Sequence, residues 1–201
     1  MTAWPSPSEV LSAAAEALAR VAASIDVAAL DRAAHDLARA ERIVVTGIGK
    51  SGIVAAKVAG TLNSLRVPAS HLAPLDAVHG DLGGLGGRDA LMVLSWSGES
   101  GLLTGIVEEA TRAGCGTVAV TRACTPLAAA CRFLVPLPET PEAAPHGAPV
   151  VRSLVQLAVA DALALAIARC RGGCAAEDFV RSHPAGALGR AALPSNAPME
   201  A

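Results

Sequence analysis

One stretch decides the fold, and it reads Arg42-Ile43-Val44-Val45-Thr46-Gly47-Ile48-Gly49-Lys50-Ser51-Gly52. Its first part, Ile43–Thr46, is a short and almost continuously apolar run, which is typical of a parallel strand buried on both faces. A glycine-rich turn follows, and Lys50–Leu65 then has the periodicity of a helix. The stretch therefore predicts a strand–turn–helix unit of an α/β protein.

The same alternation continues along the chain. Further strands are predicted at Ala69–Leu72, Ala90–Ser95, Gly116–Thr121 and Phe133–Pro136. Helices are predicted between and after them, at Leu102–Ala113, Pro126–Cys131 and Val151–Ala168. Because crossover helices cover both faces of a parallel sheet, the pattern predicts a three-layer αβα sandwich around a five-stranded parallel sheet.

Two helices are predicted before this unit, at Ser8–Ala23 and Val27–Ala40. The expected organisation is a helical segment over residues 1–40 that packs on one α/β domain at 41–190. A tail at 191–201, which contains Pro194, Asn196 and Pro198, is expected to be flexible.

Composition excludes several classes of function. The net charge is −2 and no basic run occurs, so the chain is not expected to bind nucleic acid. Five cysteines without a C-x-x-C pair predict neither a disulfide framework nor a zinc clip. The segment Val150–Cys170 is apolar, but Arg152, Gln156 and Asp161 interrupt it at intervals that suit a buried helix better than a membrane span. A cytoplasmic protein without a signal peptide is expected.

The turn at Gly47–Gly52 matches G-x-G-x-x-G, yet both nucleotide interpretations fail on context. A dinucleotide site needs a carboxylate at the end of the second strand, and none occurs before Asp76. A P-loop needs a glycine where Val44 stands inside a strand. The glycines allow a tight turn, whereas Lys50 adds charge at a helix N-terminus, so the turn predicts a small-anion site at Gly49, Lys50 and Ser51.

A second turn, Ser95–Gly101, closes a later strand and opens a later helix. Its hydroxyls at Ser95, Ser97 and Ser100, together with two glycines and free backbone amides, are typical of a phosphomonoester site. The carboxylate of Glu99 has two interpretations, a general base or an acid that the helix dipole stabilises.

Four motifs in this order resemble a known family. They are the Gly-x-Gly-Lys-Ser-Gly turn, His79-Gly80-Asp81-Leu82-Gly83, the serine loop, and Ser182-His183-Pro184-Ala185-Gly186-Ala187-Leu188-Gly189. The chain resembles the SIS (sugar isomerase) domain of arabinose 5-phosphate isomerases over nearly its whole length. The resemblance implies interconversion of D-ribulose 5-phosphate and D-arabinose 5-phosphate through an enediol, within the Kdo pathway of lipopolysaccharide and capsule synthesis.

The resemblance also implies roles for single residues. The matching catalytic residues are Lys50, Glu99, Glu142 and His183, the last reaching into a neighbouring subunit's site. The matching substrate contacts are Gly49, Ser51, His79, Ser95, Ser97 and Ser100. No metal or cofactor is implied as a requirement, although adventitious or inhibitory zinc could bind at His79 and His183. The implied partners are a phosphorylated sugar and further copies of the chain in a dimer or tetramer with shared sites.

The chain departs from the family pattern at three places. Relatives carry a run of Thr and Ser hydroxyls where Val150–Leu154 stands here, the loop Glu142–Pro149 is one residue short, and Trp96 replaces a smaller residue. Arg152 lies in the altered stretch and could replace the lost hydroxyls with a phosphate contact. The paired CBS domains that many relatives carry are not expected in this chain.

Two hypotheses of function therefore stay open beside each other. The retained motifs favour an aldose–ketose isomerase, and the altered Val150–Leu154 stretch favours a non-catalytic phosphosugar-binding module. A hexulose-phosphate isomerase is less favoured, because the motifs His79–Gly83 and Ser182–Gly189 are not expected in one.

Overall fold

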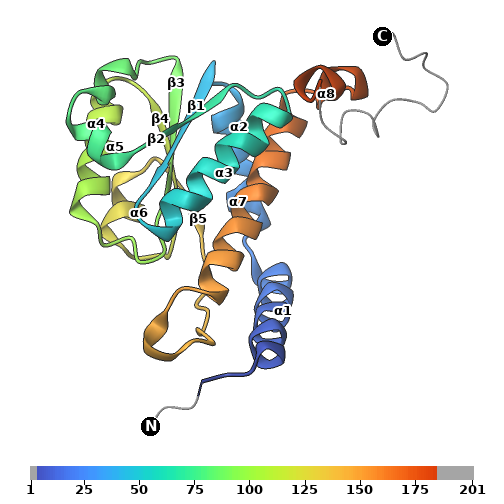
Figure 1. Cartoon of the computed structure of the whole chain (residues 1–201). Coiled ribbons are helices and arrows are strands. Elements are labelled where there is room, and N and C mark those ends of the chain that lie inside the picture. Colours follow the sequence, from blue (N-terminus) through green and yellow to red (C-terminus); the bar gives the residue numbers. More distant parts are fainter. Residues whose placement is uncertain (1–3, 185–201) are drawn as a thin grey trace, which may run out of the picture.

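The computed structural model of the chain describes residues 4–184 (Figure 1). The strands are β1 (Arg42–Gly47), β2 (Ala69–Leu72), β3 (Asp89–Leu94), β4 (Gly116–Thr121) and β5 (Phe133–Pro136). The α-helices are α1 (Pro7–Ser24), α2 (Val27–Ala38), α3 (Lys50–Ser64), α4 (Pro74–Val78), α5 (Gly101–Arg112), α6 (Pro126–Ala130), α7 (Val151–Cys170) and α8 (Ala176–Ser182). Two 3-10 turns are η1 (Asp81–Gly84) and η2 (Pro145–Gly147).

The five strands form one parallel sheet in the order β2-β1-β3-β4-β5. The predicted fold is thereby confirmed, and strand bounds agree with the sequence to within one residue. The one shift that concerns the site is at β3, which ends at Leu94, so that Ser95 already belongs to the following loop.

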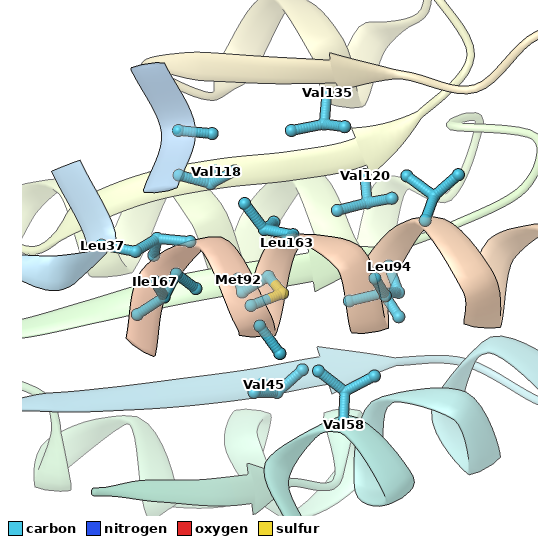
Figure 2. Close-up of a cluster of buried hydrophobic side chains, with 14 of the residues drawn as sticks. Leu37, Val45, Val58, Met92, Leu94, Val118, Val120, Val135, Leu163 and Ile167 are labelled. Carbon is cyan, nitrogen blue, oxygen red and sulfur yellow. The ribbon is translucent and has the colours of Figure 1, made fainter. Parts of the chain in front are cut away.

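Helices cover both faces of the sheet, and the strand side chains alternate between two cores. Ile43 and Val45 of β1 join the core beneath α2, α3 and α7, whereas Val44 joins the core beneath α5 and α6. Figure 2 shows the first core, where Leu163 and Ile167 of α7 lie among valines and methionine of the sheet. This alternation with period two explains why the β1 run has to be apolar at every position.

The long helix α7 forms the centre of one layer. By length and composition it is the one helix among residues 4–184 that could cross a membrane, but 56% of its most apolar window is buried inside the protein. It packs against α1, α2 and α3, which accounts for its apolarity on several sides. The predicted buried helix is therefore what the structure contains.

Four short elements were not predicted. Helix α4 begins just before the glycine-rich segment 76–88 and turn η1 lies within it, η2 lies in the loop before α7, and α8 lies near the end of the described chain. Each has seven or fewer residues, which is too few for a hydrophobic period to show. The predicted tail and the motif residues 185–189 lie outside the described residues.

Candidate functional site

The strand order reverses at one point in the sheet, and both motif loops lie there. Strand β1 has β2 on one side and β3 on the other, so the chain winds in opposite directions from this pair. Gly47 at the end of β1 pairs in register with Leu94 at the end of β3. The loops that follow them, Gly47–Gly52 and Ser95–Gly101, therefore begin side by side at the carboxyl edge, where ligands bind in open α/β sheets.

Close packing explains two of the three glycines in the first loop. A Cβ atom at Gly47 would lie 2.8 Å from the carbonyl oxygens of Leu94 and Ser51, and one at Gly52 would lie 2.6 Å from the carbonyl oxygen of Gly47. Gly49 is different, because a Cβ atom there would meet open space and its φ is +61°. It is the N-cap of α3 and provides no side-chain cap, so the first amides of α3 keep their donors for another partner.

The serine loop is shaped by its own hydroxyls. The buried Ser95 Oγ accepts a hydrogen bond from the backbone amide of Gly98 at 3.0 Å, and Ser100 caps α5 by accepting from the amide of Leu103 at 3.4 Å. Gly98 has φ +71°, and a Cβ atom on it would lie 2.3 Å from Thr125 Oγ1. The exposed Ser97 lies at the outer part of the loop, where its Oγ accepts from the amide of Glu99 at 3.4 Å.

A cavity of about 400 Å³ opens between these loops and the first turns of α7. Its size falls in the range of small-molecule sites. The residues that line it are Ile48, Lys50, Ser51, Ser95, Trp96, Ser97, Ser100, Leu103, Gly147, Pro149, Arg152, Ser153 and Gln156. The structure thus brings together five predicted residues from the two loops and Arg152 from α7.

The lining of the cavity has one sign of charge. Lys50 and Arg152 are its ionisable residues, and no Asp, Glu or His among residues 4–184 lines it. Three helices begin at this cavity, since Lys50 and Ser51 open α3, Ser100 caps α5, and Arg152 and Ser153 lie in the first turn of α7. Positive side chains and helix N-termini together favour an anion.

Glu142 does not line the cavity, and its side chain binds the backbone at the start of α7 instead. Its carboxylate, 3% exposed, accepts hydrogen bonds from the backbone amides of Val150, Val151 and Arg152 at 3.0, 2.9 and 2.8 Å. The N-cap of α7 is Val150, which has no side chain able to cap. Glu142 therefore caps α7 from a distance, where the family pattern has hydroxyls, and its predicted catalytic role stays a prediction.

Arg152, which lines the cavity, is held in place by three neighbours. Its Nε donates to the carbonyl oxygen of Thr140 at 2.9 Å and lies 4.0 Å from Glu142 Oε1. Its guanidinium carbon lies 5.7 Å from the centre of the Trp96 ring, within the range of a cation–π contact. Two of the departures from the family pattern, Trp96 and Arg152, are thus neighbours in the structure.

Besides Glu142, four predicted residues lie outside the cavity lining of this single chain. Gly49 is the N-cap of α3 and does not itself line the cavity. Glu99 is exposed on the serine loop, at its edge. His79 is exposed at the end of α4. His183 follows α8, with its Nδ1 2.8 Å from the carbonyl oxygen of Phe179 and its ring stacked on that phenyl ring. A role for His183 in the site would therefore need a second copy of the chain.

The structure does not bring the two candidate zinc ligands to one place within a chain. His79 follows α4, which packs on α5, whereas His183 follows α8, which contacts α3 on the opposite face of the sheet. Within the described part of the chain, no group of three or more His, Cys, Asp or Glu residues could hold a metal ion.

Two polar residues of the cavity were not predicted. Gln156 lies four residues after Arg152 and three after Ser153, so it is a neighbour of both on α7, because residues three and four apart are neighbours on a helix. The signal was present, since Gln156 is a polar residue inside an otherwise apolar run.

Three comparisons with known proteins agree with one another. A family model described as "SIS domain" matches residues 36–166. The chain is 40% identical over 161 residues to the arabinose 5-phosphate isomerase GutQ of Escherichia coli K12, which covers 79% of this chain and 50% of GutQ. It is 39% identical over 159 residues to the arabinose 5-phosphate isomerase KdsD of Pseudomonas aeruginosa, which covers 78% and 48%.

A solved structure has the same architecture over most of its length. It is described as E. coli CFT073 c3406 in complex with A5P, and it is 30% identical with a TM-score of 0.82. The match covers 88% of this chain and 95% of that chain. By contrast, the chain spans about half the length of the curated relatives that it matches.

Proposed function

Because the chain belongs to the SIS domain family, we propose that it is a sugar-phosphate isomerase, which interconverts D-ribulose 5-phosphate and D-arabinose 5-phosphate through an enediol. The observation that carries the proposal is the cavity at the β1–β3 switch point, which joins the serine loop to Lys50 and Arg152. The naming of GutQ and KdsD as arabinose 5-phosphate isomerases supports the same substrate, as does the A5P complex.

The phosphate end of the substrate would be held by the serine loop. Ser97 and Ser100 supply hydroxyls there, and the first turn of α5 supplies backbone amides and the positive end of its dipole. Lys50 opens α3 on the other side of the cavity and adds a formal charge. A dianionic ester would thereby meet donors from two helix starts and one ammonium group.

Isomerisation then requires a base that moves one proton between C1 and C2 of the sugar. The base removes the proton from one carbon while the carbonyl oxygen on the other carbon takes up a proton, which gives the enediol. The base then returns its proton to the former carbonyl carbon, while the hydroxyl group on the first carbon loses its proton and becomes the new carbonyl. Within residues 4–184 no carboxylate or histidine of this chain lines the cavity. The base would therefore be Glu99 turned inward from the loop edge, or His183 from a second copy in a homo-oligomer.

A non-catalytic phosphosugar-binding module is the second candidate, and one observation favours it. The Glu142 carboxylate, one of the predicted catalytic groups, is occupied by three backbone amides at the start of α7. The cavity lining of the described chain then binds the ligand but contains no carboxylate or histidine that could act as the base.

Proton exchange separates the two candidates. The protein is incubated with D-ribulose 5-phosphate in D₂O, and deuterium at C1 and C2 is followed by NMR. An isomerase incorporates deuterium into the sugar and forms the aldose. A binding module binds the ketose but incorporates no deuterium and forms no aldose. Binding without exchange in a preparation that is shown to be oligomeric would overturn the isomerase proposal.

The proposed reaction oxidises one carbon of the sugar and reduces its neighbour, with no net gain or loss of electrons, so it needs no redox cofactor. With D-arabinose 5-phosphate as its product, the enzyme would serve Kdo and lipopolysaccharide synthesis in the cytoplasm. The proposed assembly is a dimer or tetramer, since only a second copy could bring His183 to the cavity.

A further inference from the structure

Gln156 contributes a buried amide to the floor of the cavity. The residue is 2% exposed, lies in the second turn of α7, and lines the same cavity as the serine loop. Its Nε2 is buried and has no hydrogen-bond partner among the described residues. Leaving a buried amide without a partner costs free energy, and most such groups in native proteins are paired.

The position of this amide separates it from other groups of its kind. Five residues of the described chain have a buried side-chain nitrogen or oxygen without a partner, namely Asp36, Thr121, Arg122, Gln156 and Arg171. Gln156 is the one that lines the cavity at the switch point. An unmet hydrogen bond in a ligand cavity is explained when the ligand itself provides the partner.

We infer that Gln156 is a specificity-determining residue whose side-chain amide hydrogen-bonds a hydroxyl group of the sugar. The inference rests on the proposed function, because it assumes a phosphorylated sugar in the cavity. It extends that function by assigning the sugar end to the floor of the cavity beneath Arg152, one helical turn along α7.

Charge and burial support the sugar over the phosphate as the partner. Lys50 is exposed and the Arg152 side chain is 30% exposed, so both cations lie toward the mouth, whereas Gln156 is neutral and at the floor. A phosphate dianion loses more hydration on burial than a hydroxyl does, so it is better placed near the cations. A hydroxyl also donates and accepts, and it can pair with either end of an amide, whose nitrogen and oxygen exchange by a half-turn of the terminal torsion.

The experiment compares Gln156→Met with Leu157→Met. Methionine nearly keeps the length and volume of glutamine but removes the amide. Leu157 is partly buried on the same helix and does not line the cavity, so its substitution controls for a methionine in α7. Each full-length protein is titrated by calorimetry with D-arabinose 5-phosphate and, separately, with inorganic phosphate, and its melting temperature is measured.

For Gln156→Met we expect an equal or higher melting temperature, about tenfold weaker binding of the sugar phosphate, and binding of inorganic phosphate unchanged within about twofold. Leu157→Met should change neither affinity. Unchanged affinity for the sugar phosphate overturns the inference, as does an equal loss for both ligands or a failure of Gln156→Met to fold. If the wild-type protein does not bind the sugar phosphate, the proposed function fails first, and this titration distinguishes that case from failure of the inference alone.

Discussion

The Glu142 carboxylate accepts a hydrogen bond from the backbone amide of Arg152 at 2.8 Å and lies 4.0 Å from Nε of the same residue. One acidic side chain thus caps the helix and lies beside the cation that lines the cavity. The loop between β5 and α7 is tied to the start of α7 by this contact. The first residues of α7 can therefore be valines, which have no capping side chain, because Glu142 accepts the hydrogen bonds of their backbone amides.

Glu142→Ala should lower the free energy of unfolding by about 2 kcal/mol, because it leaves three helix-start amides without an acceptor. Glu142→Gln keeps one acceptor oxygen and should cost less. Glu139→Ala is the matched control, since Glu139 is 70% exposed and pairs only with Arg122 at 3.5 Å; its effect should stay below about 0.5 kcal/mol. Urea denaturation measures all three, and equal stabilities for Glu142→Ala and Glu139→Ala would contradict the capping role.

Arg152→Ala should weaken binding of D-arabinose 5-phosphate by about tenfold or more, the scale of a lost charge-assisted hydrogen bond. The control is Arg169→Ala on the same helix, because Arg169 is 72% exposed, pairs with Asp31 at 2.9 Å and does not line the cavity. Calorimetry gives both affinities. If the two variants bind alike, Arg152 serves the packing of Trp96 and not the ligand.

Lys50→Met should also weaken binding of the sugar phosphate by at least about tenfold. It should weaken binding of inorganic phosphate as well, because the ammonium group is assigned to the phosphate end of the substrate. The chain has one other lysine, Lys57, which lies two turns along α3 and pairs with Asp161 of α7. Lys57→Met removes the same charge from the same helix and should leave both affinities within about twofold. A comparable loss in Lys57→Met would point to a general charge effect.

The Arg42–Asp89 pair predicts a dependence of stability on acid. The hydrogen bond from Arg42 holds the pKa of the Asp89 carboxyl below its ordinary value, and the Gly86 amide lowers that pKa further. Folding therefore favours the ionised form of Asp89. Its contribution to the free energy of unfolding is fully present above the unfolded-state pKa of about 3.9, and it is lost as the pH falls through the lower folded-state pKa.

Asp89→Asn should accordingly reduce the free energy of unfolding most at pH 5 and above, and the difference from wild type should shrink between about pH 4 and pH 2. Glu41→Gln is the control on the same edge of the sheet, where the Glu41–Arg88 pair is well exposed at 63% and 82%. Its effect should remain below about 0.5 kcal/mol. A difference for Asp89→Asn that stays constant from pH 7 to pH 2 would contradict the assignment.

The sequence predicted the sheet better than it predicted the site. Continuous apolar runs such as Ile43–Thr46 allow few alternatives to a buried parallel strand, and the loops after β1 and β3 then have to meet. The role of Glu142 was not predictable in the same way, since it depends on how a loop folds back onto amides eight to ten residues away. In the sequence Gln156 is only a break in an apolar run, because a single sequence does not show which side of a buried helix meets a cavity.

The serine loop itself is tested by Gly98→Ala. An alanine there would adopt φ +71° and would place its Cβ 2.3 Å from Thr125 Oγ1 and 2.8 Å from Thr121 Oγ1, so the loop must shift. We expect a loss of about 2 kcal/mol in the free energy of unfolding, from the left-handed conformation and the overlap together. Affinity for the sugar phosphate should also fall by more than about tenfold, because the hydroxyls of Ser97 and Ser100 move with the loop.

The matched control is Gly105→Ala, one turn into α5, where a Cβ atom would meet nothing within 4 Å. In a helix interior this change removes conformational freedom from the unfolded chain and should raise stability by about 0.5–1 kcal/mol. Affinity should not change, since Gly105 does not line the cavity at the switch point. Urea denaturation and calorimetry on the pair separate a strained loop from a general intolerance of α5 to alanine. If Gly98→Ala keeps wild-type stability and affinity, the hydroxyl geometry of the loop does not depend on this glycine, and the assignment of the phosphate to the loop loses its structural basis.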